Sequence, residues 1–300
     1  MPDRASGRYR YGAALARALP KRVADLAAAG VGIGAGSLAG ERRIIVERHL
    51  ARAYGELSGP ALRHATRQVF LAKARYLVDG ARLPTQSASQ IDAHFVYDGY
   101  EHIDDALASG VGPILALPHV GSWEFAGAWL AKVVGHRVTA VVEALDDRET
   151  FSWMAGQRAA MGIDVVPLGP GAAAPLIRAL KERSIVCLLC DRDIVGDGVE
   201  VTFFGEKTTL PAGPATLALR TGAALLPTAV YQRGSMNHGV VRPPIPVQRE
   251  GRLRADVTRI TQLLADELEI MIRAAPEQWH IMVPNWPSDL AALAAARAGG

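Results

Sequence analysis

Short apolar runs alternate with stretches of helical periodicity from about residue 95 onward, and this alternation constrains the fold more than any other feature of the chain. The apolar runs have the length and composition of buried strands, and they cover residues 114–117, 138–142, 163–166, 185–189 and 225–230. Helical patterns lie between or after them, at residues 123–133, 149–161, 172–182, 213–221 and 257–273. Strands that alternate with helices form βαβ units. The sequence therefore predicts an α/β fold with a mainly parallel central sheet flanked by helices.

The chain is long for one domain and short for two complete ones, with 300 residues. We predict one α/β domain over residues 91–287, preceded by a helical, basic and membrane-proximal extension over residues 1–90. Residues 288–300 are rich in alanine and end in a glycine pair, and we expect them to form a disordered tail.

The extension shows helical patterns over residues 11–29, 41–54 and 60–80. A glycine-rich segment from Gly30 to Gly40 is expected to separate the first two helices. Its spacing is GxGxG after a helix, whereas a dinucleotide-binding loop has GxGxxG after a strand, so a phosphate site is not predicted there.

Charge is distributed unevenly along the chain. Residues 1–85 contain 15 Lys and Arg against 6 Asp and Glu, whereas residues 86–300 contain 18 against 24. A basic segment attached to an acidic remainder predicts an anionic surface as partner, either a membrane or a nucleic acid. No zinc-finger spacing, basic zipper or aromatic RNA-binding run is present, so nucleic acid is not expected as a partner.

The most apolar stretch of the extension, residues 11–39, is interrupted by Pro20, Lys21, Arg22 and Asp25. No uninterrupted apolar run of the length that spans a bilayer remains, so a transmembrane helix is not predicted. Two interpretations stay open for this stretch: a basic helix lying in the membrane interface, and an ordinary packed helix.

The first candidate site is the segment ILALPHVGSWEFAG, residues 114–127. His119 follows a predicted strand, and ligands of open α/β sheets bind beyond the carboxyl ends of strands. Its imidazole is a plausible general base near neutral pH, although a loop histidine bonded to the backbone is the alternative. Gly121 would let a substrate approach the backbone, and Ser122 would cap the next helix. Glu124 would act at the site or complement the helix dipole.

The second candidate site follows the predicted strand at residues 185–189 and contains Asp191 and Arg192. If this strand lies near the one before His119, the imidazole and the Asp191 carboxylate would face one another. The carboxylate would then set the imidazole tautomer and stabilise the imidazolium. Arg192 would add positive charge. The alternative is a solvated turn.

Arg158, in the predicted helix at residues 149–161, would bind a phosphate or polarise a carbonyl, unless it is an ordinary surface arginine. No GxSxG elbow, Walker A motif or metal-ligand spacing is present. Cys187 and Cys190 do not form a disulfide framework, and a strand cysteine is usually inert. A His–carboxylate dyad without a protein nucleophile would deprotonate a group of the substrate, which suggests direct transfer to an alcohol.

The segment ALPHVGSWEFAGAWL resembles the H-x4-D/E block of bacterial late acyltransferases, which acylate lipid A precursors, and most of all the branch that acylates phosphatidylinositol mannosides. Further segments match in order and spacing between about residues 95 and 286. They are Gln157-Arg158 to Gly162, CLLCDRD at 187–193, GVEVTFFGE at 198–206, LPAGPATLALRTGAALLPT at 210–228 and PEQWHIMVPNW at 276–286. The resemblance implies a glycerolipid acyltransferase-like fold.

It also implies a mechanism in which His119 is the general base on an acceptor hydroxyl, which attacks the thioester of an acyl-CoA or an acyl carrier protein. Asp191 falls where the mannoside branch has a glutamate, so its shorter side chain requires closer backbones or a bridging water. Glu124 corresponds to the acid of the block and Arg158 to the family arginine. Trp123 and its aromatic neighbours would line an acyl groove or belong to the core. The resemblance implies acyl-CoA as a co-substrate, and it implies no cofactor or metal.

The expected location is the cytoplasmic face of the plasma membrane, where the basic extension would rest on the anionic leaflet as a peripheral anchor. The lipid A enzymes of the family usually begin with a spanning helix, which favours the mannoside branch for this chain. The alternatives are O-acylation of a lipid A-type or other amphiphilic alcohol, acyl-CoA thioester hydrolysis, and a non-catalytic lipid- or CoA-binding protein.

Overall fold

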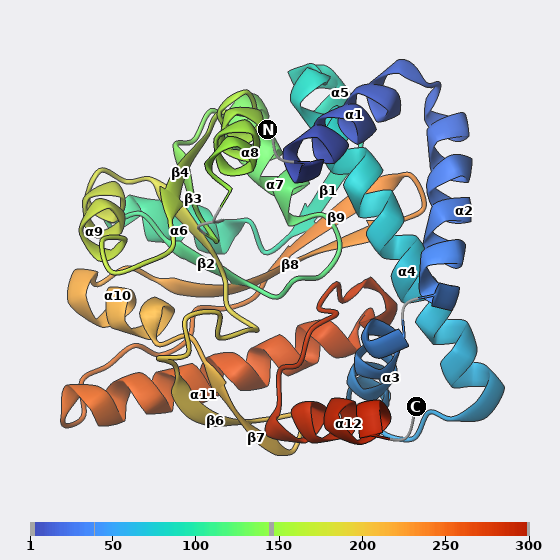
Figure 1. Ribbon diagram of the computed structural model, residues 1–300. Coiled ribbons are helices and arrows are strands. Elements are labelled where there is room, and N and C mark those ends of the chain that lie inside the picture. The colour runs from blue at the N-terminus through green and yellow to red at the C-terminus, as the bar shows by residue number, and fades with distance from the viewer. Residues whose placement is uncertain (1–3, 39, 144–146, 299–300) are drawn as a thin grey trace.

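A twisted, mostly parallel sheet lies between two layers of helices in the computed structural model, which describes residues 4–38, 40–143 and 147–298 (Figure 1). The strands are β1 (Phe95–Asp98), β2 (Ile114–Leu117), β3 (Val138–Val142), β4 (Ile163–Pro167), β5 (Ile185–Leu189), β6 (Val199–Phe203), β7 (Glu206–Leu210), β8 (Leu225–Arg233) and β9 (Met236–Val241). The helices of the N-terminal region are α1 (Arg4–Ala18), α2 (Lys21–Leu38), α3 (Gly40–Tyr54), α4 (Gly59–Arg82) and α5 (Ala88–Asp92). The later helices are α6 (Glu101–Ala108), α7 (Trp123–Trp129), α8 (Arg148–Ala159), α9 (Ala173–Lys181), α10 (Gly213–Thr221), α11 (Leu253–Arg273) and α12 (Pro287–Ala298).

The strand order within the described residues is β1-β9-β8-β2-β5-β3-β4, and a separate antiparallel pair is formed by β6 and β7. Of the pairings described in the large sheet, only that of β8 with β9 is antiparallel. The predicted α/β class and mainly parallel sheet are therefore confirmed. Because β2 and β5 are neighbours, with Leu117 opposite Leu189, their carboxyl ends lie side by side.

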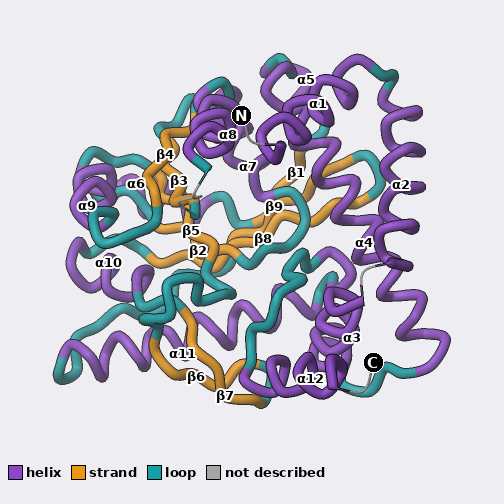
Figure 2. Tube along the Cα trace, in the orientation of Figure 1, coloured by secondary structure: helices purple, strands orange, loops and turns teal. Residues whose placement is uncertain are grey.

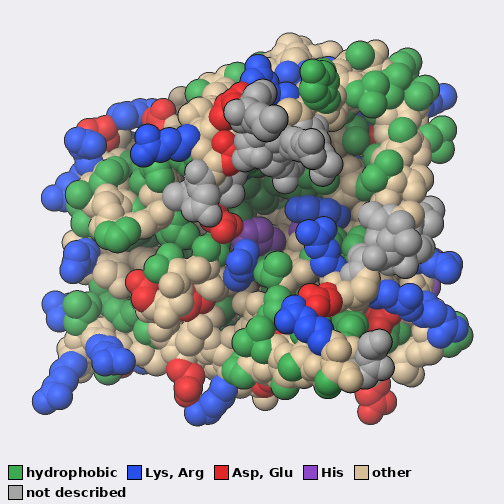
Figure 3. Space-filling model, viewed as in Figure 1, with side chains coloured by type: hydrophobic (Ala, Val, Ile, Leu, Met, Phe, Trp, Pro, Cys, Tyr) green, Lys and Arg blue, Asp and Glu red, His purple; other side chains and the backbone are tan. Residues whose placement is uncertain are grey.

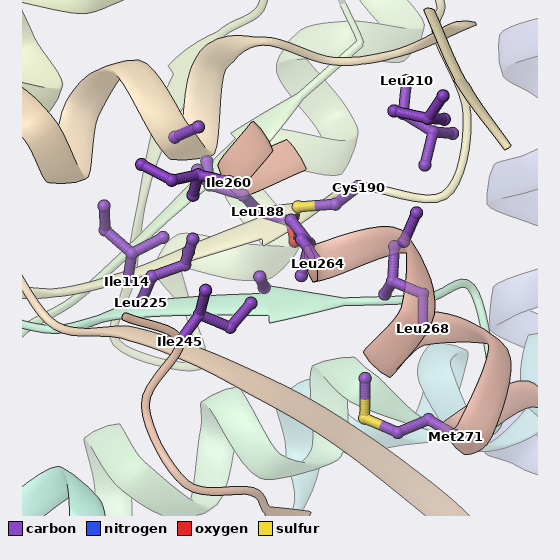
Figure 4. Close-up of a cluster of buried hydrophobic side chains, with 14 of the residues drawn as sticks. Ile114, Leu188, Cys190, Leu210, Leu225, Ile245, Ile260, Leu264, Leu268 and Met271 are labelled. Atoms are coloured by element: carbon purple, nitrogen blue, oxygen red, sulfur yellow. Dashed lines mark hydrogen bonds between the residues drawn. The ribbon is translucent and has the colours of Figure 1, made fainter. Parts of the chain in front are cut away.

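The central strands are buried on both faces, which explains their nearly continuous apolar sequences. In β2, Ile114 and Ala116 belong to one core cluster, whereas Leu115 and Leu117 belong to the cluster on the other face. The first cluster packs against α9, α10 and α11, and the second against α5, α6 and α7. Figure 4 shows the first cluster, where the strand residues meet Leu264 of α11. Burial of each large aliphatic side chain contributes about 1.5–3 kcal/mol.

Helices α2 and α4 run side by side at one edge of the molecule (Figures 1 and 2). The expected break over the glycine-rich segment is wrong, because α2 continues to Leu38. Gly32 shows the reason: a Cβ atom there would lie 2.9 Å from the carbonyl oxygen of Phe70 in α4. At this position the glycine allows two helices to approach closely instead of ending one of them. No helix in the described parts of the chain has the length and apolarity needed to cross a bilayer.

The expectation of a disordered tail from residue 288 is also wrong, because residues 287–298 form α12. The helix packs beside α3 (Figure 1), and its Asp289 side chain is fully buried. Arg48 and Arg52 of α3 form salt bridges to Asp289, and His49 bonds to its second oxygen. These partners lie more than 200 residues away in the sequence, so the alanine-rich composition alone did not reveal that this segment packs against α3.

Four strands were absent from the predictions: β1, β9 and the two strands of the β6–β7 pair. The side chains of β1 are mostly exposed, and β9 alternates between buried and partly exposed residues. Both therefore lack the continuous apolar run by which the central strands were identified.

Candidate active site

His119 lies in the loop directly beyond the carboxyl end of β2, and Asp191 lies at the equivalent place beyond β5. His119 Nδ1 is 2.6 Å from Asp191 Oδ1, and the backbone N–H of His119 donates to Asp191 Oδ2 over 2.8 Å. The predicted meeting of these two side chains is confirmed. The neighbouring strands bring the backbones close enough for direct contact, so the shorter aspartate needs no bridging water.

Asp191 is fully buried, which excludes the solvated turn considered above. Its Oδ2 atom also accepts a hydrogen bond from Trp279 Nε1 over 2.8 Å. Burial alone would raise the pKa of Asp191, but attraction to His119 and the hydrogen bonds from His119 and Trp279 outweigh it and hold the pKa below its usual value. The Asp191 carboxylate is therefore ionised near neutral pH.

The His119 side chain is 27 % exposed, in contrast to its partner. An ionised carboxylate only accepts hydrogen bonds, so the neutral imidazole carries its proton on Nδ1 and has a lone pair on Nε2; we assign the tautomer from this contact. Figure 3 shows a hollow at the centre of the face seen in Figure 1, with histidine exposed at its bottom and Lys and Arg side chains beside it. A dyad of this kind can take a proton from a bound hydroxyl group.

Glu124 lies in the first turn of α7, and Arg158 lies at the end of α8. Arg158 Nη2 is 2.5 Å from Glu124 Oε1, and Tyr76 of α4 donates to Glu124 Oε2 over 3.3 Å. Arg158 is 8 % exposed, so the surface-arginine alternative is excluded. Its guanidinium also lies 5.4 Å from the centre of the Trp123 ring. The two predicted residues thus form one partly buried salt bridge, and Tyr76 of the N-terminal region donates its hydroxyl group to the same carboxylate.

Gly121 has φ +59°, and a Cβ atom on it would lie 1.9 Å from the carbonyl oxygen of Val230. Close packing within the protein therefore requires this glycine. Its N–H donates to the carbonyl oxygen of Gln278 over 3.0 Å, and the N–H of Ser122 donates to that of Val230. The Gly121 N–H group is thus already bonded within the protein, and the approach of a substrate to this part of the backbone stays a prediction. Ser122 does not cap α7 with its side chain.

Trp123 is buried and belongs to the core cluster beneath α7, together with Phe125 and Trp129. The structure thus supports the core alternative for these aromatic side chains, and a contact of Trp123 with substrate stays a prediction. Arg192 is partly buried, and within the described residues it makes neither a hydrogen bond nor a salt bridge. Its contact with substrate likewise stays a prediction.

Cys187 and Cys190 are buried free thiols. Burial raises the pKa of Cys187 to about 12 and that of Cys190 further, so neither is a ready thiolate nucleophile. Among the residues that the structure describes, no cluster of three or more His, Cys, Asp or Glu side chains forms a candidate metal site.

Sequence reasoning did not identify two further residues at the site, Trp279 and Asn285. Both lie in the segment between α11 and α12, and Asn285 Nδ2 donates to the backbone carbonyl of Asp191 over 2.8 Å. This segment was noted as the block PEQWHIMVPNW, but nothing in its local pattern indicated that it returns to the ends of β2 and β5. A polar and aromatic cluster after the last amphipathic helix was the available signal.

A groove of about 380 Å³ lies between α2, α4 and the β8–β9 turn. Its lining includes Lys21, Arg75, Asp79, Phe125 and Gln232, but neither residue of the dyad. The lining of this groove therefore does not contain the His119–Asp191 pair.

The sheet, and a His–carboxylate pair beyond two neighbouring strands, fit a class of enzyme that transfers groups to hydroxyls. A family model described as bacterial lipid A biosynthesis acyltransferase matches residues 9–288, and the chain belongs to this family. It is an enzyme that transfers acyl groups.

Similar proteins narrow the position within the family. Two proteins from strains of Mycobacterium tuberculosis are each 41 % identical over 223 residues, which cover 72 % of this chain and 68 % of theirs. A protein of Mycolicibacterium smegmatis is 35 % identical over 297 residues, covering 97 % of this chain and 94 % of that protein. All three are named phosphatidylinositol mannoside acyltransferase. The resemblance stated from the sequence is therefore confirmed.

Proposed function

We propose that this enzyme transfers a long acyl chain from acyl-CoA to a hydroxyl group of a membrane glycolipid, and that the glycolipid is a phosphatidylinositol mannoside. The observation that carries the proposal is the pairing of buried Asp191 with partly exposed His119, which leaves Nε2 available as a base. The names of the relatives support the choice of acceptor.

The proposed reaction proceeds without an acyl-enzyme. As the acceptor oxygen attacks the thioester carbonyl, its proton moves to His119 Nε2, and Asp191 stabilises the resulting imidazolium. The tetrahedral intermediate then collapses, the carbon–sulfur bond breaks, and the CoA sulfur leaves with the proton from His119. A sugar hydroxyl is a weak nucleophile near pH 7, and general-base assistance of this kind contributes about 10²–10⁴-fold to the rate.

Glu124 and Arg158 support this reaction from the neighbouring helices. Their salt bridge joins the start of α7 to the end of α8, and α7 begins four residues after His119. We infer that the pair orients the loop that carries the base. In this proposal Arg192, which has no side-chain partner in the described residues, contacts the phosphate groups of a substrate.

We further propose peripheral binding to the anionic cytoplasmic face of the plasma membrane. The excess of Lys and Arg in residues 1–85 supports it, as do exposed apolar side chains on α1 and α2, namely Tyr11, Leu15, Leu26 and Val31. Each basic residue near an anionic surface contributes about 1 kcal/mol. In flotation with vesicles, binding should require anionic lipid and weaken at high salt. Equal binding to neutral and anionic vesicles would contradict the electrostatic part of the proposal.

The decisive experiment follows radiolabelled palmitate from its CoA thioester under three conditions: with phosphatidylinositol mannoside, with a lipid A precursor, and with no acceptor. Wild type and His119→Ala are compared in each. Label in the mannoside that depends on His119 would support the proposal. Label in the lipid A precursor alone would change the acceptor, and free palmitate without acceptor would indicate a thioesterase. Transfer that His119→Ala leaves unchanged would refute the general base.

A further inference from the structure

Two side chains from the segment between α11 and α12 donate hydrogen bonds to Asp191, one to its carboxylate and one to its backbone carbonyl. The indole N–H of Trp279 donates to Asp191 Oδ2, and the side-chain amide of Asn285 donates to the Asp191 carbonyl oxygen, each over 2.8 Å. The backbone N–H of His119 donates to the same Oδ2 atom. One carboxylate oxygen is thus held by two donors, while Oδ1 faces the imidazole.

The position of Trp279 is itself tied to the loop that carries His119. Val120 and Trp279 form an antiparallel bridge, and the N–H of His280 donates to the carbonyl oxygen of His119 over 2.8 Å. The Trp279 residue is 3 % exposed, and its indole ring stacks on His49 with their centres 4.9 Å apart. The paired backbone and the packed ring leave the indole N–H directed at the carboxylate.

We propose that Trp279 is a positioning residue for acyl transfer, whose indole N–H holds the Asp191 carboxylate against His119. The inference rests on the proposed role of His119 as general base. Trp279 does not contact the reacting atoms in this arrangement, because Asp191 lies between its N–H and the imidazole.

Loss of this one donor should have two effects. The carboxylate would be less firmly oriented, so kcat would fall while KM stayed nearly constant. More negative charge would also face the imidazole, so the imidazolium would be stabilised and the acid limb of kcat/KM would move to higher pH. Among the described residues, the other charged or titratable groups near the dyad include Cys190 and Arg192 beside Asp191, and His280 beside His119, with Lys73 of α4 facing His280. His49 stacks on Trp279. All of them remain in the variant.

The test compares Trp279→Phe with Trp286→Phe. Trp286 is a matched control because its indole N–H also donates inside the same aromatic cluster, to the carbonyl oxygen of Phe203 over 3.1 Å, and the residue is 1 % exposed. For Trp279→Phe we expect kcat to fall about tenfold with KM within about twofold of wild type. We expect its acid limb to rise by about half a pH unit. Trp286→Phe should leave the acid limb in place.

The outcomes separate the two proposals. If His119→Ala retains wild-type transfer, the general base itself is refuted. If His119→Ala is inactive but Trp279→Phe keeps the wild-type acid limb, or Trp286→Phe shifts it equally, the positioning role is refuted and the base stands.

If Trp279→Phe does not fold, the wild-type chain supplies the test through its tryptophans labelled with ¹⁵N. The five indole signals are assigned by single Trp→Phe variants, with Trp279 by elimination. Its N–H signal should move with pH as His119 ionises, and it should lose this step in His119→Gln. A Trp279 signal that stays flat across the ionisation of His119 would overturn the proposal.

Discussion

Replacement of Asp191 by asparagine should inactivate the enzyme through the imidazole tautomer. In the wild type, Oδ2 accepts the backbone N–H of His119 and the indole N–H of Trp279, and Oδ1 accepts Nδ1–H. In the variant, the single oxygen of the new amide must accept both hydrogen bonds from the two fixed donors, because the amide NH₂ group cannot act as an acceptor. The NH₂ group then faces Nδ1, which must become the acceptor and move the proton to Nε2.

An imidazole with its proton on Nε2 cannot accept one from a hydroxyl group, so we expect kcat to fall on the order of 10⁴-fold, as it does when asparagine replaces the aspartate of a Ser-His-Asp triad. All three contacts can persist in the variant, with the one to Nδ1 reversed, but they lose the negative charge of the carboxylate, which should lower the free energy of unfolding by about 1.5–3 kcal/mol. Single-turnover acyl transfer and thermal denaturation measure the two effects separately. A kcat within about threefold of wild type, in folded Asp191→Asn, would refute tautomer control. Asp191→Glu keeps the charge and tests whether this pocket tolerates the acid of the mannoside branch.

Two further predictions concern stability. Gly121→Ala should lower the free energy of unfolding by about 2–5 kcal/mol, because its φ is +59° and its new Cβ atom would meet the Val230 carbonyl oxygen. Gly135 also has a positive φ but faces open space, so Gly135→Ala should lower it by only about 1–2 kcal/mol. Equal losses in a denaturant titration would contradict the packing argument. Burial alone would raise the pKa of Asp289, but hydrogen bonds from His49 and Arg48 hold it well below its usual value. The ionised Asp289 carboxylate therefore stabilises the folded protein above about pH 4, and this stabilisation is lost as the pH falls below that value. The difference in melting temperature between wild type and Asp289→Asn should accordingly shrink in acid. A melting-temperature difference that does not depend on pH would contradict this role of the Asp289 carboxylate.

The α/β class and the positions of the central strands could be predicted because they depend on local patterns. Strands buried on both faces, such as residues 114–117 and 185–189, carry continuous apolar runs that are visible without knowledge of their neighbours. The errors arose where a local pattern had a non-local cause. Gly32 lies within a helix because Phe70 packs against it, and the alanine-rich C-terminal segment folds because α3 supplies partners for Asp289.

The residues of the active site likewise fall into those that local patterns revealed and those that they did not. His119 and Asp191 were identified because each follows a predicted strand, where the chain enters a loop on the ligand-binding edge of a parallel sheet. Glu124 and Arg158 were identified separately as candidates, but their direct salt bridge was not foreseen. The groups from the segment between α11 and α12 were missed because no periodicity links them to the strands.

The sequence by itself indicated the strands at the centre of the sheet and most of the helices around them, and it placed an imidazole and a carboxylate after two of those strands. Those properties follow from side-chain periodicity and chain order, which any contiguous stretch carries. Only the tertiary structure decided that β2 and β5 are neighbours, that their registers align Leu117 with Leu189, and that Trp279 reaches the buried carboxylate. Strand order and long-range hydrogen bonds depend on which surfaces bury each other, and this is a property of the whole folded chain.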